Sequence, residues 1–222
     1  MMTRWKQTAC GILSGMLLLS GLAVPVWAED ATDPVTNEGD WVVDDITLDM
    51  QDDGTAWGTN CFQSATSVDV PAEVDGVTIS GIQEGAFSQC FLLESLTLPD
   101  TITTIQDSAF YGCSVLKKLE IPDSVTSMGK GTMEACIALT DVKLPSTLNT
   151  LPTSTFYGCT ALETVSFPEA MNTIGSEAFY QCTALKDVDL SQIATIETYA
   201  FEGCSALTDI TIPETCTTLG DF

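Results

Sequence analysis

Histidine is missing from this sequence: none of the 222 residues is a histidine. Arginine occurs only once, as Arg4. Without histidine, the chain cannot build a Ser-His-Asp or Cys-His catalytic arrangement, and the usual zinc sites lose a main ligand. Paired carboxylates could still hydrolyse glycosides, but 31 acidic residues make close pairs by chance. We therefore predict a protein that is not an enzyme, with no catalytic residues, no bound metal and no cofactor.

Positive charge is scarce as well. The chain has 7 lysines and arginines against 31 acidic residues, which gives a formal net charge of −24. Nucleic acids and anionic lipids are bound by basic surfaces. The charge balance therefore excludes nucleic acid and a membrane surface as partners. Hydrophobic residues make up 45% of the chain, which is enough to bury a sizeable core.

Long apolar runs are absent except near the start of the chain. Arg4 and Lys6 precede an apolar run from Gly11 to Val24, and Val26-Trp27-Ala28 suits cleavage after Ala28. The run is shorter than the roughly 20 residues that a membrane-spanning helix needs. Residues 1–28 are therefore predicted to be a signal peptide, the alternative being an uncleaved membrane anchor. We expect no membrane contact beyond this export signal.

The nine cysteines lack the C-x-x-C spacing of a thiolate metal site. Six of them recur at intervals of 23, 23, 23, 23 and 22 residues: Cys90, Cys113, Cys136, Cys159, Cys182 and Cys204. A disulfide framework has no reason to be periodic, whereas stacked coils return each residue type to the same place. The spacing thus predicts a repeat protein with a column of buried, reduced thiols. Cys61 and Cys216 lie outside the column and are also expected to be unpaired.

Each repeat has two halves. A strand phrase follows each cysteine, with apolar residues in the pattern L-x-x-φ-x-φ-P, as in Leu93, Leu96, Leu98 and Pro99. Alternation in φ-x-φ predicts a short strand that proline ends. The other half runs from an isoleucine, or its substitute, to the cysteine eight residues later, and its apolar spacing suits a short helical or 3₁₀ turn. Neither half can bury its apolar side alone, so the copies must stack.

The segments "IGSEAFYQCTAL" and "VSFPEAMNTIG" resemble the BspA-like leucine-rich repeats of bacterial surface proteins, whose unit is I-G-x-x-A-F-x-x-C-x-x-L-x-x-L-x-L-P. The likeness extends from Ile82 to Gly220. Thr132-Met133 replaces Ala-Phe in the third copy, and the fifth copy has Ser191 in place of proline and a shorter loop. The resemblance implies an α/β repeat solenoid: a right-handed leucine-rich-repeat coil with one short strand per repeat of about 23 residues.

These observations divide the chain after the signal peptide into three parts. Residues 29–40 read as a flexible acidic leader. Apolar alternation in residues 41–62 predicts an N-terminal cap over the first coil, since an open solenoid end favours aggregation. Residues 63–222 form the solenoid. Because the last residues, "TTLGDF", start a further unit, we expect this solenoid to be truncated at its C-terminus.

The exposed face of the strands is the candidate binding surface. Residues on either side of each buried strand position form two outward columns. Lys118 beside Asp141 and Glu120 beside Lys143 would be opposite charges on adjacent strands, which stabilise a sheet. Like charges on adjacent strands repel. Asp187, Asp189 and Asp209 would form an acidic group of this kind, which a cationic partner or a calcium ion would neutralise. The predicted binding residues are Lys118, Glu120, Asp141, Lys143, Asp187, Asp189 and Asp209.

The resemblance implies an exported bacterial protein, secreted or on the cell surface. Its strand face would bind another protein, from a host or a neighbouring cell, for adhesion. Two alternatives stay open. The chain could be a non-catalytic targeting module of a larger secreted enzyme that acts on cell walls or glycans. It could also have an architectural role in a surface layer, which would require self-association.

Overall fold

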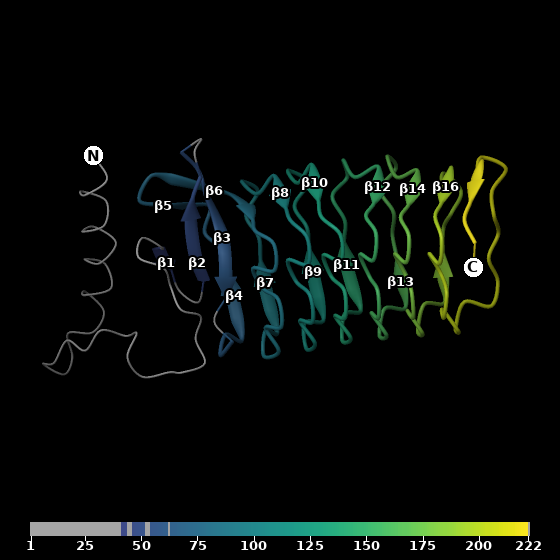
Figure 1. Cartoon of the computed structure of the whole chain (residues 1–222), viewed down its shortest axis with the longest axis horizontal. Coiled ribbons are helices and arrows are strands. Elements are labelled where there is room, and N and C mark those ends of the chain that lie inside the picture. Colours follow the sequence, from purple (N-terminus) through teal and green to yellow (C-terminus); the bar gives the residue numbers. More distant parts are fainter. Residues whose placement is uncertain (1–40, 44–45, 52–53, 62, 222) are drawn as a thin grey trace, which may run out of the picture.

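The protein is an elongated β-solenoid whose coils stack along one axis (Figure 1). This computed structural model describes residues 41–43, 46–51, 54–61 and 63–221. The predicted signal peptide and acidic leader lie outside these ranges. Within them, no helix is long and apolar enough to cross a membrane.

The φ-x-φ phrases form a row of short parallel strands, hydrogen-bonded in pairs, which is the first strand ladder. Its members are β4 (Ser67–Asp69), β7 (Ser95–Thr97), β9 (Lys118–Glu120), β11 (Asp141–Lys143), β13 (Thr164–Val165) and β15 (Asp187–Val188). Hydrogen-bonded pairs join β4 to β7, β9 to β11 and β13 to β15. In the second pair Lys118 faces Asp141, so one coil is 23 residues long. This confirms the repeat register read from the cysteines.

A second parallel ladder runs along the isoleucine column. It consists of β6 (Val77–Ile82), β8 (Thr104–Ile105), β10 (Ser127–Met128), β12 (Thr150–Leu151), β14 (Thr173–Ile174), β16 (Thr195–Ile196) and β17 (Thr218–Leu219). The strands pair in the orders β6-β8-β10 and β12-β14-β16-β17. Most repeats therefore contain two strands, and the prediction of one strand per repeat was wrong. Most strands of the second ladder are two residues long, such as Thr104–Ile105, which is too short for an alternation of apolar and polar residues to be seen in the sequence.

The half of each coil between the isoleucine and the cysteine was predicted to be helical, and this was wrong. No helix occurs among the described residues, so the α/β class is not confirmed. Two residues per coil, four positions apart, have φ between 54° and 78°: Gly85 and Gln89, Ser108 and Gly112, Gly131 and Ala135, Ser154 and Gly158, Glu177 and Gln181, and Tyr199 and Gly203. A left-handed residue cannot continue a right-handed helix. The segment therefore advances as linked turns.

Backbone hydrogen bonds in these turns alternate between neighbouring coils and the same coil. The amides of Gly85, Phe87 and Gln89 donate to carbonyls of the next coil at 2.6 to 3.0 Å. The amides of Ser88 and Cys90 donate to carbonyls three residues earlier. A helix would send every amide to the carbonyl four residues back. Here every second amide joins adjacent coils, which explains how buried turns satisfy their polar groups.

An antiparallel meander lies at the N-terminal end of the solenoid (Figure 1). Its strands are β1 (Trp41–Val43), β2 (Ile46–Met50) and β3 (Ala56–Cys61), and β3 pairs in parallel with β6. The strand β5 (Glu73–Val74) makes a hairpin with β6 through Asp75 and Gly76, whose φ angles are 50° and 82°. This hairpin makes the first coil longer than the later ones.

The meander packs closely against the first coil at Gly81. A side chain at this position would place its Cβ 2.6 Å from the indole ring of Trp57. Only glycine lets the Trp57 ring of β3 lie this close to the β6 backbone. The later coils carry Thr104, Ser127 or their equivalents at this position.

The core consists of apolar columns that run the length of the solenoid. Phenylalanine rings stack from coil to coil, with centroid distances of 5.6 Å for Phe87–Phe110, 5.3 Å for Phe156–Phe179 and 5.2 Å for Phe179–Phe201. Met133 takes the same place in the third copy and is fully buried. The isoleucine, leucine and cysteine columns are buried beside them. The prediction of a continuous apolar core with aligned thiols is confirmed.

Five thiols of the cysteine column donate to a carbonyl of the preceding coil at 3.0 to 3.1 Å. The pairs are Cys113 to Phe87, Cys136 to Phe110, Cys159 to Met133, Cys182 to Phe156 and Cys204 to Phe179. All five are free and buried, as predicted. A cysteine therefore fits this column as a small apolar residue with one weak donor, aimed at a carbonyl that also accepts a backbone amide of its own coil.

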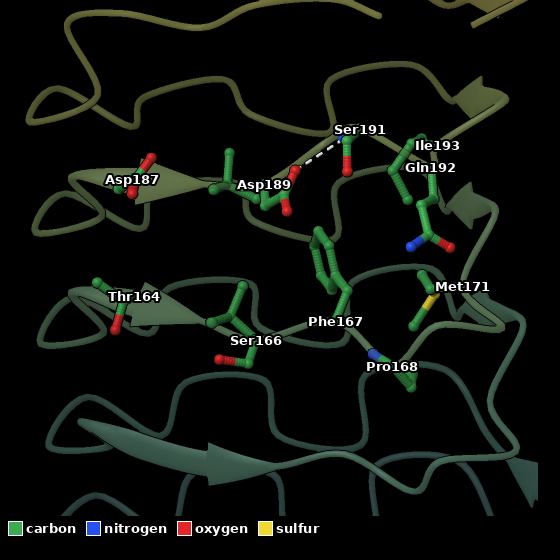
Figure 2. A pocket seen from close by; sticks show the side chains of 12 residues that line it. Thr164, Ser166, Phe167, Pro168, Met171, Asp187, Asp189, Ser191, Gln192 and Ile193 are labelled. Carbon is green, nitrogen blue, oxygen red and sulfur yellow. Dashed lines mark hydrogen bonds between the residues drawn. The ribbon is translucent and has the colours of Figure 1, made fainter. Parts of the chain in front are cut away.

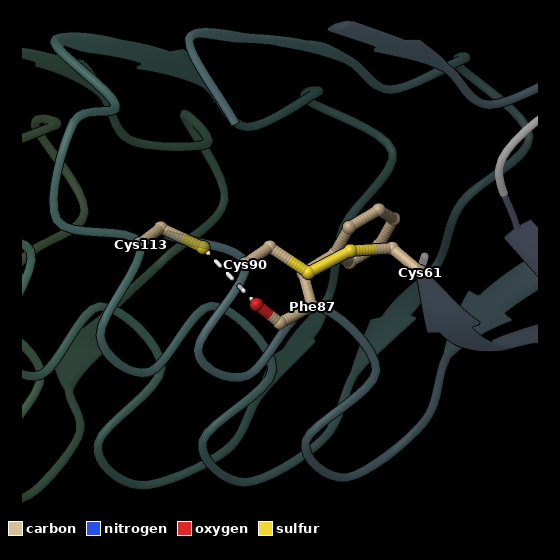
Figure 3. The surroundings of a disulfide bond; sticks show 4 residues. All are labelled: Cys61, Phe87, Cys90 and Cys113. Carbon is tan, nitrogen blue, oxygen red and sulfur yellow. Dashed lines mark hydrogen bonds between the residues drawn. A yellow bond between two sulfur atoms is a disulfide. The ribbon is translucent and has the colours of Figure 1, made fainter. Parts of the chain in front are cut away.

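Cys61 and Cys90 differ from this pattern because they form a disulfide (Figure 3). Cys61 lies at the end of β3, and its amide donates to the carbonyl of Ala86 in the first coil. The prediction that Cys61 is unpaired and Cys90 reduced was therefore wrong. Sequence periodicity concealed the bond, since only one of the two cysteines belongs to the column. Cys216 is free, as predicted.

Thr101 provides a test of the hydrogen bonding between coils. Its hydroxyl is buried without a hydrogen-bond partner in the described part of the chain. The equivalent Ser124, one coil later, donates to the carbonyl of Ile102 at 2.7 Å. Thr101→Val should raise the free energy of unfolding by about 1 kcal/mol, because it removes an unsatisfied polar group without changing shape. Thermal denaturation measures this, and Ser124→Ala should be destabilising by a similar amount. A loss of stability in Thr101→Val would contradict the expectation.

Candidate functional site

The candidate site is the outer face of the first strand ladder. In β4, β7, β9 and β11 the central residue is buried and both neighbours are exposed. The parallel register places equivalent residues directly beside each other on adjacent strands. Exposed polar side chains therefore form two continuous columns, which is the surface that the sequence pattern predicts. At one end, the hydroxyl of Ser95 donates to that of Ser67 at 2.7 Å.

Opposite charges meet in the middle of this face. Lys118 Nζ lies 3.5 Å from a carboxylate oxygen of Asp141 on the next strand, which confirms that predicted pair. It also lies 2.9 Å from Glu120 on its own strand. The hydrogen bond to Glu120 is the main cause that raises the pKa of Lys118, and it lowers the pKa of Glu120 in turn. The site thus contains a three-membered ionic group whose net charge is negative.

Lys143 lies directly beside Glu120 in the strand register, as predicted, but forms its ion pair with another residue. Its ammonium group pairs with Asp123, at 3.7 Å. The Asp123 carboxylate also accepts the amide of Ser146 at 2.7 Å, and this backbone hydrogen bond is the largest cause that lowers its pKa. Asp123 was not among the predicted site residues, because this residue follows the proline that ends the strand.

The three aspartates of the predicted acidic group do not share one strand ladder. Asp187 and Asp189 lie at β15, with Asp187 inside the strand and Asp189 directly after it. Asp209 lies in residues 207–213, which form no strand. The Asp189 carboxylate accepts the amide of Ser191 at 2.9 Å, and this bond lowers its pKa. Asp189 therefore also has a structural role that its sequence position did not reveal.

A hollow of about 290 Å³ opens beside Asp187 and Asp189 (Figure 2). It lies between two successive coils and is lined by residues of β13, β15 and the loops that follow them. Phe167, Met171 and Ile193 supply apolar surface, while Ser166 and Gln192 add polar groups. The sequence signal was present in the shortened fifth copy, where Ser191 replaces proline.

Metal and thiol chemistry find little support in the structure. The described residues contain no group of three acidic or cysteine side chains placed to hold a metal ion. Burial raises the pKa of Cys159 to about 12 and that of Cys204 to about 11. These thiols therefore stay protonated at neutral pH, and a protonated thiol is neither a nucleophile nor a metal ligand.

The solved structures most useful for comparison are bacterial leucine-rich repeat proteins. The T. pallidum leucine-rich repeat protein is 24% identical over 79% of this chain and 83% of that chain, with a TM-score of 0.68. A protein from Eubacterium ventriosum is 27% identical over 77% of this chain and 47% of that chain, with a TM-score of 0.63. One from Bacteroides ovatus is 22% identical over 81% and 61%, with a TM-score of 0.54.

A search of curated proteins finds no match. The family profile described as "BspA type Leucine rich repeat region (6 copies)" matches residues 80–204, more than half of the chain. These residues contain the Ala-Phe, cysteine and leucine columns that build the core described above. The chain therefore belongs to the BspA-type leucine-rich repeat family.

Proposed function

We propose that this chain is exported, displayed on a bacterial cell surface, and binds another protein through the outer face of its first strand ladder. Repeat proteins of this architecture commonly act as interaction modules, and membership of the BspA-type family supports that role for this chain. The basic, apolar and small-residue start of residues 1–28 supports export. Adhesion to a host cell or to a neighbouring cell is the role that we assign to this binding.

The observation that carries the proposal is the exposed register of the strand face. Adjacent strands of such a ladder lie about 4.8 Å apart, so each column presents side chains at regular intervals on a rigid support. The side chains that hold the coils together point inward, as Leu119 and Val142 do. The outward ones, such as Lys118 and Asp141, can change without loss of the core. A rigid surface with variable side chains suits the recognition of proteins.

An adhesion assay with two matched variants tests this function. Beads coated with the chain are mixed with cultured epithelial cells and with bacterial cells, each before and after trypsin treatment. The strand-face variant carries Lys118→Ser and Asp141→Ser, and the control carries Lys130→Ser and Glu84→Ser on the other side of the coil. Both variants keep the net charge. We expect trypsin-sensitive adhesion to one cell type, reduced about fivefold or more in the strand-face variant and unchanged in the control.

Circular dichroism must first show that both variants are as stable as the original chain. Adhesion that resists trypsin would argue against a protein ligand. Equal loss of adhesion in both variants, or no adhesion to either cell type, would contradict the proposal.

A further inference from the structure

The hollow beside β15 exists because one coil is irregular. In the apolar column that ends each strand phrase, Leu98, Ile121, Leu144 and Leu190 are buried. Phe167 is larger and only partly buried, and its ring contacts Phe179 on one side at a centroid distance of 6.1 Å. Figure 2 shows the ring extending from its own coil toward Asp189 and Ser191 of the next. Part of an aromatic ring therefore faces the hollow rather than the core.

The neighbouring coil leaves room for this ring. Its loop is one residue shorter, since Thr173 pairs with Thr195, 22 positions later. Ser191 stands where other copies have proline, and its free amide donates to the Asp189 carboxylate. This bond fixes the carboxylate at the edge of the hollow, beside the Phe167 ring (Figure 2). A backbone amide therefore helps to orient the Asp189 carboxylate.

Size and charge restrict what the hollow can hold. Pockets for small-molecule ligands usually measure about 300 to 1,000 Å³, so a volume of about 290 Å³ suits a single side chain better than a cofactor. Two carboxylates, of Asp187 and Asp189, line it together with the Phe167 ring, and no lysine is among the lining residues. Lys186 precedes Asp187 but pairs with Glu163 at 2.8 Å. The hollow thus combines an aromatic surface with two carboxylates, and its lining includes no lysine to neutralise them.

We propose that this hollow binds the side chain of an arginine from the partner protein, an inference that rests on the proposed function of the strand face. The planar guanidinium group stacks on an aromatic ring and directs several N–H donors to carboxylates at its edge. Phe167 supplies the ring, Asp189 beside it supplies the acceptor, and Asp187 at the other end of β15 adds negative charge (Figure 2). A lysine ammonium group lacks the planar face, so it binds here less tightly.

Short peptides test the site without the natural partner. The chain labelled with nitrogen-15 is titrated with acetyl-Gly-Arg-Gly-amide, with the lysine analogue, and with the analogue that contains citrulline, which is neutral but has nearly the same shape. We expect the arginine peptide to shift the amide signals of Phe167, Asp189 and Gln192. The citrulline peptide should bind about tenfold or more weakly, because charge-assisted hydrogen bonds are lost. Equal binding of the arginine and citrulline peptides, or shifts confined to other coils, would overturn the proposal.

Variants separate this hollow from the general negative charge of the protein. Asp189→Asn should weaken binding of the arginine peptide about tenfold, and Asp187→Asn, which removes a more distant charge, about threefold. The asparagine at 189 can still accept the amide of Ser191, so the turn is kept. Phe167→Leu, which restores the common residue of the column, should weaken binding about threefold. Asp209→Asn removes the same charge outside the hollow and should change affinity less than twofold. A similar loss in Asp209→Asn would attribute binding to diffuse charge and overturn the proposal.

The same variants distinguish this inference from the proposed function. If adhesion depends on Lys118 and Asp141 but survives Asp187→Asn with Asp189→Asn, the strand face binds protein and the arginine site is wrong. If the arginine peptide binds in the hollow but the coated beads adhere to no cell, the site exists and the adhesive role is wrong.

Discussion

Replacing Phe179 with alanine is expected to lower the free energy of unfolding by about 3 to 5 kcal/mol. The Phe179 side chain is fully buried and contacts three other rings. It stacks on Phe156 and Phe201 in the adjacent coils and meets the edge of the Phe167 ring. Each coil buries its apolar side only against its neighbours, so a cavity here weakens two interfaces between coils at once.

Urea denaturation followed by circular dichroism measures the loss. Phe91→Ala is the matched control, because Phe91 is 51% exposed and its removal should change stability by no more than about 0.5 kcal/mol. Hydrogen exchange should show the largest loss of protection in the coils from β14 to β16. If the two phenylalanine variants lost equal stability, the assignment of Phe179 to a continuous packed column would be wrong.

Much of this column could be predicted from the sequence alone. A spacing of 23 residues between like cysteines determines which residues of neighbouring coils lie side by side, provided that each repeat is one coil. The pairing of Lys118 with Asp141 follows directly, and the structure places their strands in that register. The same reasoning predicted the burial of Ile105 and Leu116. Periodicity is thus informative where a residue contacts its own equivalents.

The errors concern features that do not repeat, or that repeat without an apolar pattern. The turns were predicted as helical because apolar spacings of three and four residues fit a helix as well as linked turns. Positive φ angles, which exclude a helix, occur at Gln89 and Ala135, and these residue types do not usually indicate such angles. The partner of Cys90 could not be found because Cys61 lies in the meander, outside the repeat. Ion pairing of Lys143 with Asp123 depends on a loop conformation that follows the strand.

The sequence predicted the exposed strand face of the candidate site but not the hollow beside Asp187 and Asp189. The outward columns follow from strand alternation, and Asp187 and Asp189 were correctly assigned to the exposed face. The hollow beside them arises from a one-residue deletion combined with the large Phe167 side chain. Neither change is conspicuous in the sequence, since volume between coils depends on how both backbones adjust. Irregular repeats therefore merit attention as places where a regular scaffold opens.

Loss of the Cys61–Cys90 disulfide is expected to destabilise the N-terminal end of the solenoid by about 3 to 4 kcal/mol. The bond closes a loop with a sequence separation of 29 residues, which includes the β5–β6 hairpin of the first coil. In the chain-entropy account, a cross-link stabilises the folded state because it restricts the unfolded chain. The gain is about 3 kcal/mol for a loop of 15 residues and about 4.7 kcal/mol for one of 100, so this loop falls between them. The bond also joins the meander to the first coil (Figure 3).

Cys61→Ala tests this expectation, with Cys216→Ser as the control. Cys216 is a free cysteine on a partly exposed position, so its replacement should leave stability unchanged. Thermal denaturation with and without dithiothreitol should show that reductant destabilises the original chain and Cys216→Ser but has no effect on Cys61→Ala. The other described cysteines are free thiols, which dithiothreitol does not reduce, so Cys61–Cys90 is the one disulfide it can break among the described residues. If reductant left the original chain unaffected, Cys61 and Cys90 would not be joined in solution, and non-covalent contacts such as the β3–β6 pairing would hold the meander in place.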